Sequence, residues 1–117
     1  MSFRSRIKPF VDAEISASIA HRKEGNHRAE FAHLERAHVL GQAATIEHVR
    51  AHYLMLLWSI RQHSAKEFFG QIFRIVGAAT KTAFGWVPTG NTGGANVSPF
   101  KPMAIPDDLQ AILRATQ

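Results

Sequence analysis

Apolar residues recur along most of the chain at spacings of three and four, which is the pattern of amphipathic α-helices. No run alternates apolar and polar residues over the length of a half-buried strand. The sequence therefore predicts an all-α fold. We expect one compact bundle of four main helices and a short C-terminal helix within a single domain, residues 1–117.

Residues that begin and end helices set the bounds of five predicted helices. Pro9 suits a first helical turn, Ser64 and Glu67 form a capping box, and Gly41 and Gly85 are placed to end helices. The predicted helices span residues 10–24, 28–40, 46–63, 64–84 and 107–115. Between the last two, residues 85–106 are too rich in glycine and proline for a regular element, so we expect a long loop that wraps the bundle and covers one side of it.

The two longest predicted helices differ in how their apolar residues are distributed. Helix 46–63 is apolar nearly all round, and we expect only the strip with Arg50 and Arg61 to face solvent, which predicts a central helix. Helix 64–84 is two-sided, and we expect its apolar side to be buried and its polar side to face solvent. The apolar side holds Phe68, Phe69, Ile72, Phe73, Ile75, Val76 and Ala83, and the polar side holds Glu67, Gln71, Arg74 and Lys81.

Histidine is the unusual component of the composition, because five of the seven histidines lie between residues 33 and 63. His48 and His52 are four residues apart, which places both imidazoles on one face of their helix, together with Met55. This is the spacing that two metal ligands on a helix need.

The preceding helix offers partners for these two histidines. If the two helices form an antiparallel hairpin with its turn near residue 43, equal rise places His38 opposite His48, and Glu35 opposite His52. We therefore predict that Glu35, His38, His48 and His52 converge. Histidines with one carboxylate suit a divalent transition metal such as zinc, iron, copper or nickel.

Three further residues are candidates for a supporting role around this site. Glu30 falls near the centre of the inward arc of its helix, and Met55 continues the stripe of His48 and His52. His33 lies about 140° around the helix from His38, so both cannot reach one ion.

Other uses of the same residues stay open. His38 or His52 could act as a general base oriented by Glu35, which would make the protein an enzyme. The histidines could instead be structural groups in a helical interaction module. A di-iron carboxylate centre would need two Glu-x-x-His motifs on inward faces, and the sequence offers one good motif.

The rest of the amino-acid composition limits the classes of partner and the cellular location that we expect. The chain has no cysteine, and its formal charge of +5 comes from scattered basic residues. Its longest apolar stretch, residues 53–58, is far short of the ~20 residues of a membrane span. Helix 46–63 is too apolar to be a recognition helix for DNA. We expect a cytoplasmic protein that has no signal peptide and does not bind nucleic acid. The oligomeric state stays open, and a homo-oligomer is possible.

Two stretches of the chain resemble a known family. They are Phe31–Gln42 with His48–His52, and the loop Gly90–Met103. Both are similar to the domain of unknown function 3703 family of short bacterial helical proteins, which has no assigned activity. The residues that match its pattern are Glu35, His38, His48 and His52, and the resemblance adds Asn91 and Asn96 of the loop as candidates.

Overall fold

The computed structural model describes residues 1–81, 92–95 and 102–117, and all the regular structure in these ranges is helical. The all-α prediction is therefore confirmed. The helices are α1 (Phe3–Lys23), α2 (His27–Gly41), α3 (Thr45–Arg61), α4 (Ala65–Lys81) and α5 (Asp107–Thr116). No helix in these ranges is long and apolar enough to cross a membrane.

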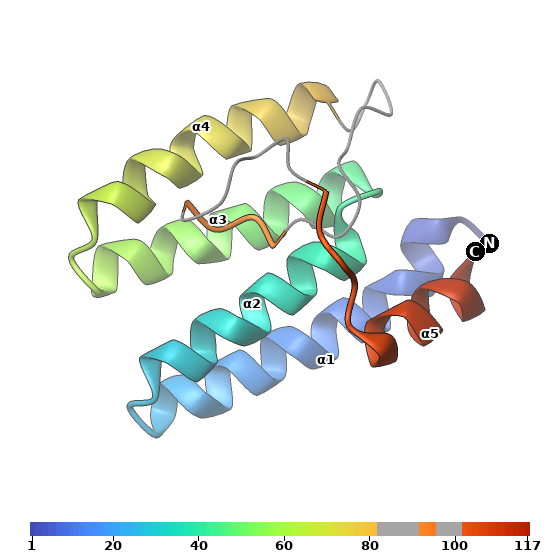
Figure 1. The fold of residues 1–117 in the computed structure, drawn as a ribbon, viewed down its shortest axis with the longest axis horizontal. Coiled ribbons are helices and arrows are strands. Elements are labelled where there is room, and N and C mark those ends of the chain that lie inside the picture. Colours follow the sequence, from blue (N-terminus) through green and yellow to red (C-terminus); the bar gives the residue numbers. More distant parts are fainter. Residues whose placement is uncertain (82–91, 96–101) are drawn as a thin grey trace.

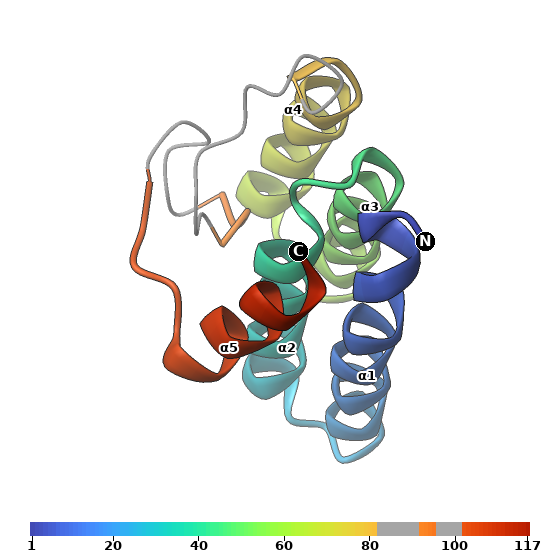
Figure 2. The ribbon, with the colours of Figure 1, turned by 90° about the vertical axis from the view of Figure 1, so that its right-hand side faces the viewer.

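The four long helices form two hairpins, α1 with α2 and α3 with α4, which meet where α2 packs against α3 (Figure 1). The short helix α5 lies across α1 and α2 (Figure 2). It brings the C-terminus beside the N-terminus, where Arg6 Nε donates a hydrogen bond to the carbonyl of Thr116 at 2.7 Å. The hairpin of α2 and α3 is the part of this arrangement that positions the histidines.

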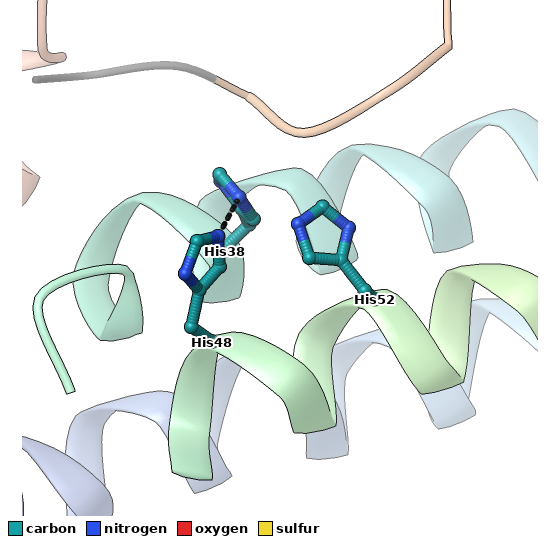
Figure 3. A group of neighbouring side chains, drawn as sticks. All are labelled: His38, His48 and His52. Atoms are coloured by element: carbon teal, nitrogen blue, oxygen red, sulfur yellow. Dashed lines mark hydrogen bonds between the residues drawn. The ribbon is translucent and has the colours of Figure 1, made fainter. Parts of the chain in front are cut away.

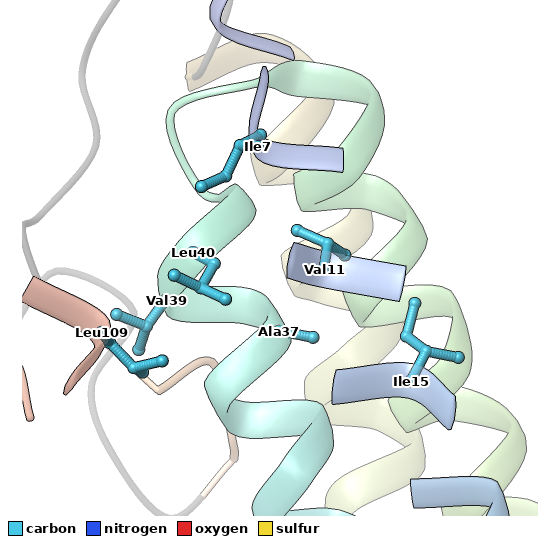
Figure 4. Close-up of a cluster of buried hydrophobic side chains, with 7 residues drawn as sticks. All are labelled: Ile7, Val11, Ile15, Ala37, Val39, Leu40 and Leu109. Carbon is cyan, nitrogen blue, oxygen red and sulfur yellow. The ribbon is translucent and has the colours of Figure 1, made fainter. Parts of the chain in front are cut away.

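The main apolar core lies between α1, α2 and α5 (Figure 4). Three residues of α1 at a spacing of four face α2, and Leu109 closes the core from α5. Burying each of the larger aliphatic side chains stabilises the fold by about 1.5–3 kcal/mol. This core holds α2 from the side of α1 and α5. Its members are Ile7, Val11, Ile15, Ala37, Val39, Leu40 and Leu109.

Helix α1 begins seven residues before the predicted start, so that prediction is wrong. Ser2 caps the helix, because its side chain accepts a hydrogen bond from the backbone N–H of Ser5. Pro9 lies inside the helix, where it removes one backbone hydrogen bond. The fully buried side chains of Ile7 and Val11 lie on either side of it, and their packing outweighs the local cost of the proline.

Helices α3 and α4 correct the predicted pattern of burial. The polar side of α4 is turned inward, with Gln71 and Arg74 buried, whereas Phe69 on the apolar side is 69% exposed. Helix α3 packs between α2 and α4 but is not buried all round, because Tyr53 and Ile60 are each about half exposed. The physical reason is that α4 hydrogen-bonds through its polar side to a histidine of α3 and to residues of the loop.

Only four residues of the loop's glycine-rich part, 92–95, lie within the described ranges, and they lie against α2 and α4. Gly93 is at φ +82° and so close to His38 that an added Cβ would lie 2.6 Å from its ring, which favours glycine at this position. The backbone N–H of Ala95 donates to the carboxylate of Glu67. The predicted extension of α4 to residue 84 and most of the predicted wrapping loop lie outside the described residues.

Candidate metal site

Three buried histidines meet between α2 and α3 (Figure 3). His38 of α2 is 3% exposed, and His48 and His52 of α3 are 8% and 2% exposed. One ring nitrogen from each lies within 4.8 Å of the other two, and His38 Nε2 and His48 Nε2 are 3.0 Å apart. Within the described residues this is the one group of three or more potential ligand side chains that comes together in this way.

The short turn between α2 and α3 sets the distance between these helices. Gly41 ends α2, and its carbonyl accepts a hydrogen bond from the N–H of Ala44. A Cβ at Gly41 would lie 2.8 Å from the Cβ of Glu47, so a glycine here allows the first turn of α3 to approach α2. This close approach brings His48 within hydrogen-bonding distance of His38.

Helix α4 fixes the tautomer of His52 through Gln71. The side-chain amide of Gln71 donates to two acceptors, the carboxylate of Glu67 and the carbonyl of Gly93, each at 2.8 Å. Its carbonyl oxygen must therefore be the atom that faces His52 Nδ1, 2.6 Å away, and that nitrogen must carry the proton. The other nitrogen of His52, Nε2, is left with its lone pair, and Figure 3 shows that this side of the ring is turned toward His38 and His48.

Burial keeps two of the imidazoles neutral at neutral pH. Loss of solvation lowers the pKa of His48 to about 3, with a smaller contribution from the charge of a protonated His52. Loss of solvation also lowers the pKa of His52 to about 4. The hydrogen bond that His52 donates to Gln71 opposes this shift, and the cation of Arg74 adds to it. A neutral imidazole is the form that binds a metal ion.

These lowered pKa values predict that the protein becomes less stable as the pH falls below 6.5, the ordinary pKa of histidine. The unfolded chain takes up protons at His48 and His52 that the folded protein excludes. The free energy of unfolding should therefore fall by about 2–4 kcal/mol between pH 7 and pH 5. Urea denaturation over a series of pH values measures this.

The matched control for the pH series is the variant His48→Gln/His52→Gln. Glu35 acts in the opposite direction, because its pKa is raised, and it remains in both proteins. The difference between the two pH profiles therefore isolates the histidines. Parallel profiles between pH 7 and pH 5 would contradict the prediction.

Two carboxylates lie near the histidines without belonging to the group of three. Glu35 is half-buried, and burial raises its pKa; a hydrogen bond with the side chain of Thr92 opposes the shift, and the negative charge of Glu67 adds to it. Glu67 accepts hydrogen bonds from Gln71 and from Ala95 N–H. The structure thus places Glu35 beside the loop, outside the 4.8 Å group of nitrogen atoms.

None of the residues predicted to support the site belongs to the group of three histidines. Glu30 is buried, but its carboxylate is paired with Arg61. His33 faces α1, where it hydrogen-bonds Glu14 at 2.9 Å and stacks on His21. Met55 is fully buried on the turn of α3 after His52. The loop candidates Asn91 and Asn96 lie outside the described residues.

Sequence reasoning missed Gln71 and Glu67, which hold His52 and residues 93–95 in place. The available signal was their spacing of four, the same spacing as His48 and His52, which makes a polar stripe on α4. The pattern did not show which side of the helix is buried.

These observations define a helical protein with a buried three-histidine group that could hold a metal ion. The chain belongs to the family described as "Protein of unknown function (DUF3703)", whose model matches residues 5–113. This confirms the family suggested by the two similar stretches. No curated protein and no solved structure matches the chain.

Proposed function

We propose that the protein binds one divalent transition-metal ion between α2 and α3 through His38, His48 and His52. The observation that carries the proposal is the orientation of His52. Its Nδ1–H is held by Gln71, which leaves Nε2 as a ligand directed at the other two histidines. Histidines that bind metals almost always donate their second nitrogen to a fixed acceptor in this way.

The cost of burying the three rings supports the same conclusion. Burying an imidazole nitrogen away from water costs free energy unless that nitrogen is hydrogen-bonded or binds an ion, and one ion would serve all three rings at once. Without an ion, one of His38 Nε2 and His48 Nε2 must carry a proton and donate it to the other. For a metal ion to bind both Nε2 atoms, this proton would move to Nδ1 of the same ring, and both imidazoles would stay neutral.

The ligand set limits the choice of ion. Imidazole nitrogen suits zinc, copper, iron and nickel, and the chain has no cysteine to supply a thiolate. Three histidines leave one coordination position for water or a carboxylate, as in catalytic zinc sites. Glu35, three residues before His38 on α2, is the carboxylate we propose for this position.

The proposed role is that of a cytoplasmic metal-binding or metal-responsive accessory protein. The segment 92–95 supports the metal-responsive form of the proposal, because Gly93 contacts His38 and also accepts a hydrogen bond from Gln71. An ion that shifts the rings of His38 or His52 would therefore act directly on this segment.

Metal analysis of protein produced without a histidine tag tests the proposal. About one zinc, copper, iron or nickel ion per chain is expected after reconstitution and gel filtration, with a raised melting temperature. The variant His48→Ala/His52→Ala should retain none. The matched control His21→Ala/His33→Ala also removes two neighbouring histidines and should retain the full content. Metal content near zero in the wild type, with no thermal shift for any of the four ions, would refute the proposal.

An acid–base enzyme is the second candidate, and the electrostatics of the site do not favour it. A general base works best when its pKa lies near the working pH. Burial holds the pKa of His48 at about 3 and that of His52 at about 4, which makes both weak bases at neutral pH.

A purely structural role for the histidines predicts destabilised alanine variants and no metal in the wild type.

A further inference from the structure

A large apolar surface lies on the outer side of the α3/α4 hairpin. Eight large hydrophobic side chains are between 37% and 69% exposed there. In α1, by comparison, the most exposed large hydrophobic residues are Phe10 and Ile19, each at 39%. We call this set the α3/α4 apolar surface. Its members are Ile46, Tyr53, Leu57 and Ile60 of α3, and Phe69, Ile72, Phe73 and Val76 of α4.

The geometry of the hairpin places the exposed residues of α3 and those of α4 on the same side of the hairpin. On α3 the exposed residues lie opposite the buried stripe of His48, His52 and Met55. On α4 they lie opposite Gln71 and Arg74, which face the same interior as that stripe. The two helices lie next to each other (Figures 1 and 2). Because their buried residues share one inner side, it follows that their exposed faces lie together on the outer side.

The size of this surface matches what one protein partner buries. Three of its side chains are aromatic and would present about 150–250 Å² each if fully exposed. With their observed exposures, the eight side chains together expose on the order of 700–800 Å². The largest apolar patch on a typical monomer is about 300–600 Å², whereas each partner of a standard interface buries about 800 Å².

The spacing along both helices is that of a helical bundle. Ile46, Tyr53 and Ile60 recur every seven residues on α3, and Phe69 and Val76 are seven apart on α4. Repeats of seven let a stripe of side chains pack along a second helix over its whole length. Two such hairpins placed face to face would complete a four-helix bundle.

The charges around the surface favour an identical partner. In a two-fold symmetric contact each patch meets itself, so any net charge near the axis would meet its own sign. The eight residues carry no charge. Arg50, which borders them on α3, is already paired with Asp12 at 2.7 Å and with Glu47 at 3.1 Å, and Arg61 is paired with Glu30. These arginines are therefore committed within the chain. Lys66, which is exposed on α4 next to the surface, adds one cation, whereas binding to an anionic membrane would need several.

We propose that the α3/α4 apolar surface binds a second copy of this chain, so that the two α3/α4 hairpins form a four-helix bundle at the centre of a homodimer. The histidines lie on the inner side of the same hairpin, away from this contact. The proposal does not depend on metal binding, and removal of His48 and His52 should leave the dimer in place.

Light scattering coupled to gel filtration, with the full chain at a series of concentrations, tests the dimer. The wild type should elute with twice the chain mass of 13.0 kDa. Tyr53→Glu on α3 and Phe73→Lys on α4 should each raise the dissociation constant by at least about 30-fold, because each places a charge in the contact. The control Ile19→Lys introduces the same charge at an exposed apolar position of α1 and should remain dimeric.

The variants replace exposed side chains, so their helix content by circular dichroism should equal that of the wild type. A wild type that stays monomeric up to high micromolar concentration would overturn the proposal, as would variants that keep the dimer mass. A monomer that binds vesicles of anionic phospholipid through this surface, with loss of binding in Phe73→Lys, would also overturn it and assign the surface to a membrane.

Discussion

Replacing His52 by alanine is expected to weaken metal binding by more than about 100-fold, with the folded structure retained. The variant removes one of three ligands, and loss of a ligand should exceed the 10–100-fold cost of changing a residue that merely orients one. Isothermal titration with zinc, or competition with a chromophoric chelator for tighter binding, measures the affinity. The heat should depend little on the ionisation enthalpy of the buffer, because His48 and His52 are already neutral in the free protein and give up no proton to the solvent.

A variant of Gln71 separates ligand loss from ligand orientation. Gln71→Leu removes the acceptor for His52 Nδ1–H and leaves that nitrogen buried without its partner, so His52 is free to take the other tautomer. We expect a loss of affinity of about 10–100-fold, smaller than that of His52→Ala. His33→Ala is the matched control, since His33 of α2 faces α1 and hydrogen-bonds Glu14 instead. An equal effect of all three substitutions would contradict the assignment of His52 as a ligand.

The part of the site that sequence predicts well is the part that local geometry determines. The four-residue spacing of His48 and His52, together with a short turn at Gly41, is enough to place His38 opposite them in an antiparallel hairpin. The structure brings these three residues together. The helix geometry did not fix the side chain of Glu35, which hydrogen-bonds the side chain of Thr92 in the loop.

The contribution of α4 could not be predicted in the same way, because an amphipathic pattern identifies two sides and does not by itself identify the buried one. The usual rule buries the apolar side. Here Gln71 is fully buried, since its amide satisfies three different groups, and Phe69 and Phe73 remain exposed. If a second copy covers the apolar side, both sides of α4 are buried in the dimer, and the conflict with the rule disappears.

The bounds of α1 show the same limit at a smaller scale. The sequence rule that places proline in the first turn led to a predicted start near Pro9, whereas capping by Ser2 and burial of Ile7 extend the helix toward the N-terminus. A local preference worth a few kcal/mol is overridden when apolar residues on both sides of it join the core.

Replacing Arg61 by methionine is expected to lower the free energy of unfolding by about 3–5 kcal/mol, the cost of leaving a buried charge without its partner. Glu30 of α2 is 3% exposed, and Arg61 of α3 donates to both of its carboxylate oxygens, at 3.1 and 2.7 Å. The pair joins α2 to α3 at the end of the hairpin distant from Gly41. Urea denaturation of Arg61→Met against the wild type measures the loss.

The reverse substitution should cost less, and this asymmetry is the sharper test. In Glu30→Gln the remaining charge belongs to Arg61, whose side chain is 34% exposed and can be solvated. The double variant Glu30→Leu/Arg61→Met removes both charges and should recover most of the stability lost in Arg61→Met. Because Glu30 is committed to Arg61, Glu30→Gln should also leave metal affinity unchanged, although helical periodicity places it on the inward arc of α2. Equal losses of stability in Arg61→Met and Glu30→Gln would show that the buried carboxylate of Glu30 does not need Arg61. A lowered metal affinity in Glu30→Gln would show that Glu30 takes part in metal binding.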